Sequence, residues 1–283
     1  MKRFVVVLFL ACATSVLAQH DHRAMGAMKT SPDARLEVRN DAAAQVLTVR
    51  IGPLTLPANS DHMAVAQAPA LFLEVPFDGW ITAYHPRLVD GAGQPEPGRL
   101  LHHVAFYNTA RPDFLCPNKQ EHIFGAGGEM NDWPALPGVG YRVRKGDRIR
   151  ISTMFHNPTP ASYPETWLQV KVDYRSAARG EPLNSVYPAW FDVQECHDSG
   201  YDLGPGRSLK MGEFKLSFGG LLLRSAGTCT TTAGNSICST SRAARMSRRS
   251  RRNWIPRAGS RACRLSASPI TARTSWTRET CFG

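Results

Sequence analysis

WLQVKVDY, residues 167–174, alternates apolar and polar side chains along its whole length. Successive side chains of a β-strand point to opposite faces, so the apolar members of this segment are expected to line one buried face. They are Leu168, Val170, Val172 and Tyr174. A period of two over eight residues indicates a half-buried strand and excludes an amphipathic helix here.

Six further segments are short and apolar or alternating, and Gly, Pro or Asp residues bound them. They are residues 45–51, 71–75, 79–84, 101–107, 141–143 and 148–155. RKGD, residues 144–147, predicts a hairpin turn between the last two. No segment shows a long helical period. Many short strands separated by Gly and Pro predict an all-β fold, an antiparallel jelly-roll-like sandwich over residues 36–175.

The pattern changes after the sandwich. Residues 176–187 are polar, contain Pro and Gly, and are expected to form a linker. Residues 188–220 return to β character and predict the start of a second β domain. From 221 to 283 the alternation ends, so we expect the second domain to be incomplete and the basic tail to be disordered.

The N-terminus has the features of a secretory signal peptide over residues 1–19. Lys2 and Arg3 precede an apolar run, and small residues before Ala18 suit cleavage near that position. Cys12 as a lipoprotein cysteine is the alternative. Residues 20–35 form a His- and Met-rich leader that could collect a soft metal. No stretch is long enough for a membrane span. A signal peptide without a later span predicts a periplasmic or secreted protein.

Export has a consequence for Cys116 and Cys196. An oxidising compartment permits a disulfide between them, and two unpaired buried thiols are the alternative. The sequence does not decide between the disulfide and the unpaired thiols.

The net charge of +11 is confined to one end of the chain. Residues 221–283 contain 12 Arg and one Glu, with neither Lys nor Asp, which leaves 22 basic and 22 acidic residues in the remainder. The net charge of residues 1–220 therefore gives no reason to expect binding to nucleic acid or to a membrane surface.

Two adjacent histidines, His102 and His103, stand inside an apolar strand, LLHHVAFY at 100–107. A buried imidazole needs a partner for each nitrogen, and a metal ion is one solution. Because neighbours on a strand face opposite ways, both can reach one ion only if the strand bulges or the rings use different nitrogens. One core and one surface histidine is the alternative.

A third histidine, His156, ends the strand predicted at 148–155. A set of three histidines from distant strands suits copper, with zinc as the second choice. The other histidines between the leader and the tail are expected on the surface or in loops. They are His62, His85, His122, which we place in a polar loop, and His197.

These residues resemble the first catalytic domain of the copper type II, ascorbate-dependent monooxygenases, the group of peptidylglycine α-hydroxylating monooxygenase and dopamine β-monooxygenase. The resemblance runs from about 36 to 223. It rests on the His102-His103 pair, Cys116, GAGGE at 125–129, LPGVGYRV at 136–143, and the strand ending in His156. The chain has fewer cysteines than the animal enzymes and continues after that strand as His-Asn-Pro. The resemblance implies that His102, His103 and His156 hold an electron-transfer copper. It also implies ascorbate or another reductant and a small organic substrate hydroxylated with O2.

The same family carries a second copper on a His-x-His pair and a Met in its second domain. No histidine follows His197 here. The peptide GTCTTTAGNSI at 227–237 can be encoded by a DNA string that reads His-Leu-His-Asp-Tyr in another frame. We therefore expect that a one-base slip near 219–224 replaced the end of this domain. The rival interpretation is a basic arm for anionic partners formed by Arg242, Arg245, Arg248, Arg249, Arg251 and Arg252.

The sequence thus predicts an exported copper-binding protein related to two-copper monooxygenases. Because the second copper's ligands are missing, we expect little or no hydroxylase activity from the chain as written. A periplasmic copper carrier or sensor is the alternative function. A third possibility is that the histidines are structural and bind no metal.

Overall fold

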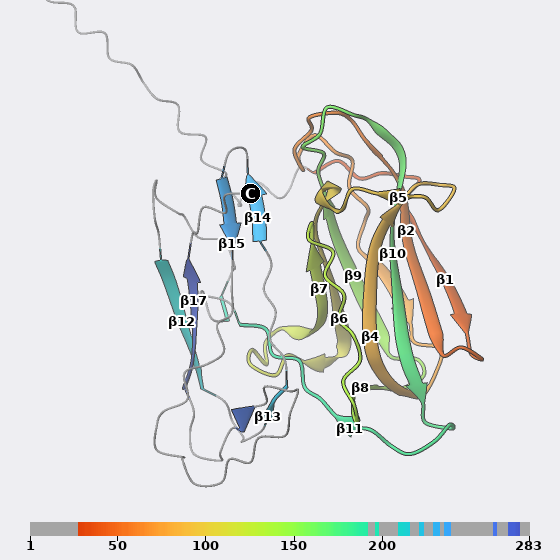
Figure 1. The fold of residues 1–283 in the computed structure, drawn as a ribbon, viewed down its shortest axis with the longest axis vertical. Helices are drawn as coiled ribbons and strands as arrows, with labels where there is room; N and C mark the ends of the chain where they lie inside the picture. Colours follow the sequence, from red (N-terminus) through yellow and green to blue (C-terminus); the bar gives the residue numbers. More distant parts are fainter. Residues whose placement is uncertain are drawn as a thin grey trace, which may run out of the picture.

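The computed structural model describes residues 28–191, 196–197, 209–215, 221–223, 229–232, 235–238, 263–264 and 271–277. Within these ranges the chain is almost entirely β, with one short 3-10 turn, η2, at Gly98–Leu100. Two sheets make up the sandwich (Figure 1), as the alternation of apolar residues predicts. The all-β sandwich prediction is confirmed. The signal peptide and residues 20–27 of the leader lie outside the described residues.

The larger sheet is built around strand β10, Tyr163–Ser176, which contains the alternating segment. β10 pairs antiparallel with β2, Val46–Leu56, on one side and with β4, Gly79–Val89, on the other. The predicted inward face is confirmed, because its four apolar side chains are at most 6% exposed. The remaining strands of this sheet are β1 at Arg35–Asp41, β5 at Pro95–Glu96, β8 at Val139–Val143 and β11 at Asn184–Ser185.

The smaller sheet has the order β3-β9-β6-β7, and all its pairings are antiparallel. The strands are β3 at Leu71–Glu74, β9 at Arg148–Phe155, β6 at Leu101–Pro112 and β7 at Gln120–Gly127. Phe106, Phe124 and Phe155 from this sheet are almost fully buried and belong to the same apolar cluster as Leu47 and Ile51 of β2. The burial of these large side chains between the layers is the main stabilising term of the fold.

The prediction of a hairpin around residues 144–147 was wrong. Residues 144–147 do form a turn, with the Asp147 N–H donating to the Arg144 carbonyl at 3.0 Å. Its flanking strands are not a hairpin, however, because β8 pairs with β4 in the larger sheet and β9 with β3 and β6 in the smaller one. A turn motif fixes a reversal of the chain but not whether the two strands stay in one sheet.

β1 and β7 were not predicted as strands. β1 is exposed over most of its length and lacks the apolar alternation of a half-buried strand. β7 carries two glycines, which favour a loop, yet it is buried almost throughout. His122 therefore lies in a buried strand and not in a polar loop.

After the sandwich, the segment predicted as a linker contains β11, which pairs in parallel with β8. In the region of the second β domain the structure describes strand β12, Leu209–Lys215, paired with β17, Thr271–Thr277. Disorder was expected for the tail, but its described parts form short strands, two of which, β14 and β17, are rich in β-branched Thr, a residue type favoured in strands. These are β13 at Leu221–Leu222, β14 at Cys229–Thr232, β15 at Asn235–Cys238, β16 at Cys263–Arg264 and β17. The rest of 221–283 lies outside the described residues.

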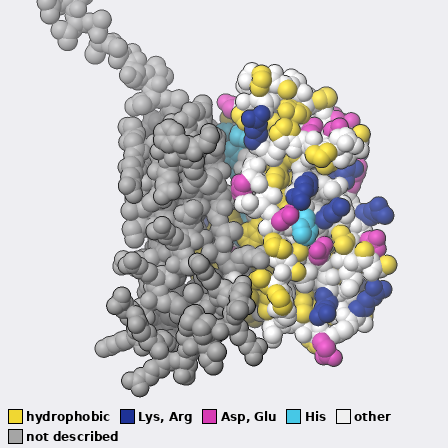
Figure 2. Space-filling view, viewed as in Figure 1, with side chains coloured by type: hydrophobic (Ala, Val, Ile, Leu, Met, Phe, Trp, Pro, Cys, Tyr) yellow, Lys and Arg dark blue, Asp and Glu magenta, His cyan; other side chains and the backbone are white. Residues whose placement is uncertain are grey.

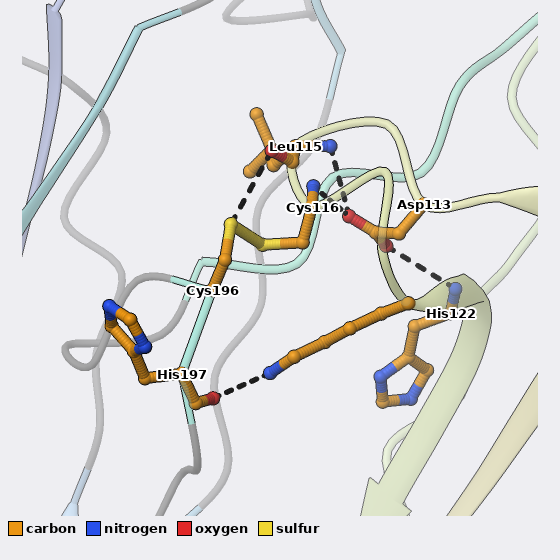
Figure 3. The surroundings of a disulfide bond; sticks show 7 residues. Asp113, Leu115, Cys116, His122, Cys196 and His197 are labelled. Carbon is orange, nitrogen blue, oxygen red and sulfur yellow. Dashed lines mark hydrogen bonds between the residues drawn. A yellow bond between two sulfur atoms is a disulfide. The ribbon is translucent and has the colours of Figure 1, made fainter.

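A disulfide joins Cys116, in the loop between β6 and β7, to Cys196, with the two Cα atoms 5.3 Å apart (Figure 3). The loop itself is held by Asp113, whose Oδ1 accepts the backbone N–H groups of Leu115 and Cys116, each at 2.9 Å. Of the two alternatives left open for these cysteines, the structure has the disulfide. It fastens residues 196–197 to the smaller sheet, 80 residues earlier in the chain.

Charged side chains of both signs are interspersed over the face of the sandwich drawn in Figure 2. This agrees with the equal numbers of basic and acidic residues before residue 221.

Candidate metal centre

A β-bulge sets the orientation of the histidine pair. In the pairing of β6 with β9, Leu101 faces Phe155 and His103 faces Met154, so His102 has no counterpart. An extra residue of this kind bends the strand and turns its side chain relative to its neighbours. As a result the two Nδ1 atoms of His102 and His103 lie 3.0 Å apart. The sequence indicates that both histidines could reach one ion if the strand bulged. The structure has this bulge.

His156 comes to the same place from the end of β9. Its backbone N–H donates to the Leu100 carbonyl at 3.0 Å, just before β6 begins. Its ring centroid is 5.3 Å from that of His102, compared with 5.1 Å between His102 and His103. The structure thus brings together all three histidines that the sequence selected.

A fourth histidine, His62, joins them from the loop between β2 and β3. Its ring centroid is 5.7 Å from that of His102. The sequence placed His62 on the surface or in a loop, and it does lie in a loop, but no local signal in Ser60-Asp61-His62-Met63 could have shown that this loop reaches the other histidines. Only the pairing of this loop with the chain beyond β9 places it here.

Two buried amide side chains hold this corner of the sandwich. Gln67 donates from Nε2 to the carbonyls of His62 and Phe155, at 2.8 and 2.9 Å, and accepts the Phe155 N–H at 2.8 Å. On the other side of His156, Asn157 and Ser60 exchange backbone hydrogen bonds of 2.7 and 2.8 Å. The loop that carries His62 is therefore attached to the chain on both sides of His156.

Asn157 is fully buried and satisfies several backbone groups at once. Its Nδ2 lies 3.1, 2.9 and 2.7 Å from the carbonyl oxygens of Leu56, Pro57 and Ala161. Its Oδ1 accepts both the N–H and the hydroxyl of Thr159. This side chain fixes the turn that begins directly after His156.

We expect Asn157→Ala to lower the free energy of unfolding by about 3 kcal/mol, because it leaves buried carbonyl groups without donors. Urea unfolding of the metal-free protein measures this. The matched control is Asn184→Ala, which removes an exposed amide with a single bond of 3.4 Å and should change stability by less than about 0.5 kcal/mol. Equal effects of the two substitutions would contradict the role given to Asn157.

The surroundings favour the neutral form of His103 and His156. Burial, with a smaller contribution from the charge of His62, lowers the pKa of His103 from 6.5 to about 4. Burial and the charge of His62 also lower the pKa of His156, against a hydrogen bond to the Arg99 backbone carbonyl. A neutral imidazole is the form that binds metal.

The spacing and type of the donor atoms show whether these residues fit a metal ion. As the side chains stand, the described part of the chain contains no group of three His, Cys, Asp or Glu residues arranged to hold an ion. The His102–His103 pair alone has a suitable spacing, since two nitrogens bound to one ion at about 2.0–2.1 Å are about 2.9–3.4 Å apart. The torsion that orients an imidazole ring is broad, so the His156 ring can turn without leaving its place. The donor chemistry therefore fits copper or zinc.

The remaining histidines of the sandwich lie elsewhere. His85, on β4, lies between Asp132 and Asp173, with its ring nitrogens 3.3 Å from a carboxylate oxygen of each. His122, on β7, is stacked on Trp190 at 3.9 Å between ring centroids. Gly125 makes room for this stack, because a Cβ there would lie 3.3 Å from the Trp190 ring. Neither histidine has a ring contact with His102 among the described residues.

Part of the chain is similar to two proteins named as copper-dependent oxygenases. One is "Probable copper-dependent oxygenase M1" of Phoma sp., 30% identical over 111 residues, which are 36% of this chain and 27% of that protein. The other is "Probable copper-dependent oxygenase clz3" of Cochliobolus lunatus, also 30% identical over 111 residues, 36% of this chain and 34% of that protein. The chain thus spans between about a quarter and a third of the length of these relatives.

No protein-family model and no solved structure matches the chain. Among the described residues, no helix has both the length and the apolar character to cross a membrane.

Proposed function

We propose that this protein is an exported copper-binding protein related to copper-dependent oxygenases, and that His102, His103 and His156 bind the ion. The observation that carries the proposal is the bulge at His102, which brings two adjacent ring nitrogens to 3.0 Å from each other, next to the His156 ring. The names of the two relatives favour copper over zinc, which the same donors would also accept.

The chain's own residues would serve the ion in distinct ways. His102 and His103 offer a preformed pair of donors on a sheet strand, which is a more rigid support than a loop. The backbone hydrogen bond from His156 to the Leu100 carbonyl holds the third imidazole beside this pair. The low pKa of His103 keeps its donor unprotonated in mildly acidic solution, so protons compete weakly with the metal.

A copper ion bound here would supply one-electron redox chemistry. In the ascorbate-dependent monooxygenases, with which the sequence shares its histidine pattern, the corresponding histidines hold the electron-transfer copper. Ascorbate or another reductant and a small organic substrate are the partners that this relationship implies. Since no His-x-His pair follows His197, we infer that this chain lacks the second copper site and has little or no hydroxylase activity.

The proposal is tested by loading the purified chain with copper and measuring its stoichiometry and its oxygen uptake with ascorbate. We expect one tightly bound copper ion per chain and oxygen uptake no faster than that of free copper. A chain with the reading frame restored near 219–224 should bind two ions and take up oxygen. Failure of the chain as written to retain copper would contradict the copper site. Rapid oxygen uptake by this chain would contradict the loss of activity.

A copper carrier or sensor is the second candidate, and one observation favours it. The described chain starts beside the metal centre, because Lys29 and Ser31 both form backbone hydrogen bonds of 2.8 Å with Gln67. His20, His22 and Met25 precede this point in the sequence but lie outside the described residues. A carrier would lose copper affinity when residues 20–27 are deleted and would gain no oxygenase activity from frame restoration. Unchanged copper affinity after the deletion, together with oxygenase activity after frame restoration, would favour the enzyme lineage.

A further inference from the structure

His62 is a donor that neither the sequence pattern nor the resemblance assigns to the metal centre. Its ring centroid lies 5.7 Å from that of His102, close to the 5.1 and 5.3 Å that separate His102 from His103 and His156. Among the described residues, these three are the imidazoles with a ring contact to His102.

The backbone under His62 is well held, as a ligand requires. The Asp61 carboxylate accepts the N–H groups of Met63 and Ala64 at 2.9 Å each, which closes a turn around His62. Gln67 then ties the His62 carbonyl to that of Phe155. A side chain on such a loop loses little further entropy when it binds an ion, and this preorganisation favours affinity.

The chemistry of copper gives a reason for a fourth imidazole. Oxidised copper favours four ligands in a square or tetragonal arrangement, with nitrogen and oxygen donors. Three histidines leave one of these positions to water or to another side chain. An imidazole on the adjacent loop can fill it with either ring nitrogen.

We propose that His62 is the fourth imidazole ligand of the copper ion held by His102, His103 and His156. The inference rests on the proposed copper site and adds a ligand to the three that the family resemblance implies. It makes the loop between β2 and β3 part of the metal centre, so that copper binding would link this loop to the ends of β6 and β9.

The test compares full-length wild type with His62→Phe, which keeps an aromatic ring and removes both donor nitrogens. The matched control is Met63→Leu, a change of an exposed neighbour in the same loop. Each protein is loaded with Cu(II), and the number of coordinated imidazoles is counted by pulsed EPR and X-ray absorption. We expect four imidazoles in wild type and in Met63→Leu, three in His62→Phe, and copper affinity about 10- to 100-fold weaker in His62→Phe.

The outcomes separate this inference from the copper site itself. Three imidazoles in wild type, or an unchanged count and affinity in His62→Phe, would overturn the role of His62 and leave the three-histidine site in place. Failure of wild type to bind copper would overturn the site as a whole. The wild-type count needs no variant, so the inference stays testable if His62→Phe does not fold.

Discussion

Replacing His103 with alanine is expected to weaken copper binding by at least about 100-fold. His103 contributes one of the two ring nitrogens that the bulge sets 3.0 Å apart, and its loss leaves the ion without the preformed half of its site. Substitutions in the shell around a metal already cost about 10- to 100-fold, and removal of a direct ligand costs at least as much. Competition with a coloured copper chelator measures the affinity directly.

Thermal unfolding provides an independent measure of the same effect. A ligand that binds only the folded state at about 1,000 times its dissociation constant adds about 4 kcal/mol to the stability. Copper should therefore raise the melting temperature of wild type strongly and that of His103→Ala little. His85→Ala is the matched control, since it removes a half-buried histidine from β4, away from the centre. Equal copper affinity in wild type and His103→Ala would refute the proposed site.

Acidification of the metal-free protein is expected to remove about 3 kcal/mol of stability through His122. Burial is the main cause that lowers the pKa of His122 to about 4, against an ordinary value of 6.5. Between these pH values the unfolded chain binds a proton at this residue and the folded chain does not. Stability therefore falls as the pH drops from about 6.5 to about 4, by 1.36 kcal/mol for each unit of the difference.

The contribution of His122 is read from the difference between wild type and His122→Phe, which keeps the stack on Trp190. Burial raises the pKa of Glu121, which acts in the opposite direction over part of this range and is common to both proteins. Urea unfolding near pH 7 and near pH 4.5, with chelator present, should show a weaker loss on acidification in the variant. Tyr107→Phe changes a ring whose centroid lies 4.6 Å from that of His122 and keeps the imidazole. Its loss of stability on acidification should therefore equal that of wild type. A variant as acid-sensitive as wild type would rule out His122 as the cause.

Much of the fold follows from the period of the side chains. The alternation at 167–174 predicts a strand and its inward face, and that strand lies between β2 and β4 in the larger sheet. The sequence could not show that β8 and β9 lie in different sheets, because a turn has the same composition in either case. It also could not reveal β7, whose glycines are favourable in loops and whose burial depends on β6 and on Trp190.

For the candidate site, the sequence by itself determined the residue types and three of the positions. Adjacent histidines in an apolar strand and a histidine at the end of another are unusual enough to stand out, since buried imidazoles need partners. Only the tertiary structure decided that His102 is the bulged residue, because a bulge is defined by the pairing of one strand with another. Only the tertiary structure placed His62 beside them, because the bonds made by Ser60 and Gln67 join residues about 90 positions apart. Local sequence records which side chains can bind a metal, and long-range pairing decides which of them meet.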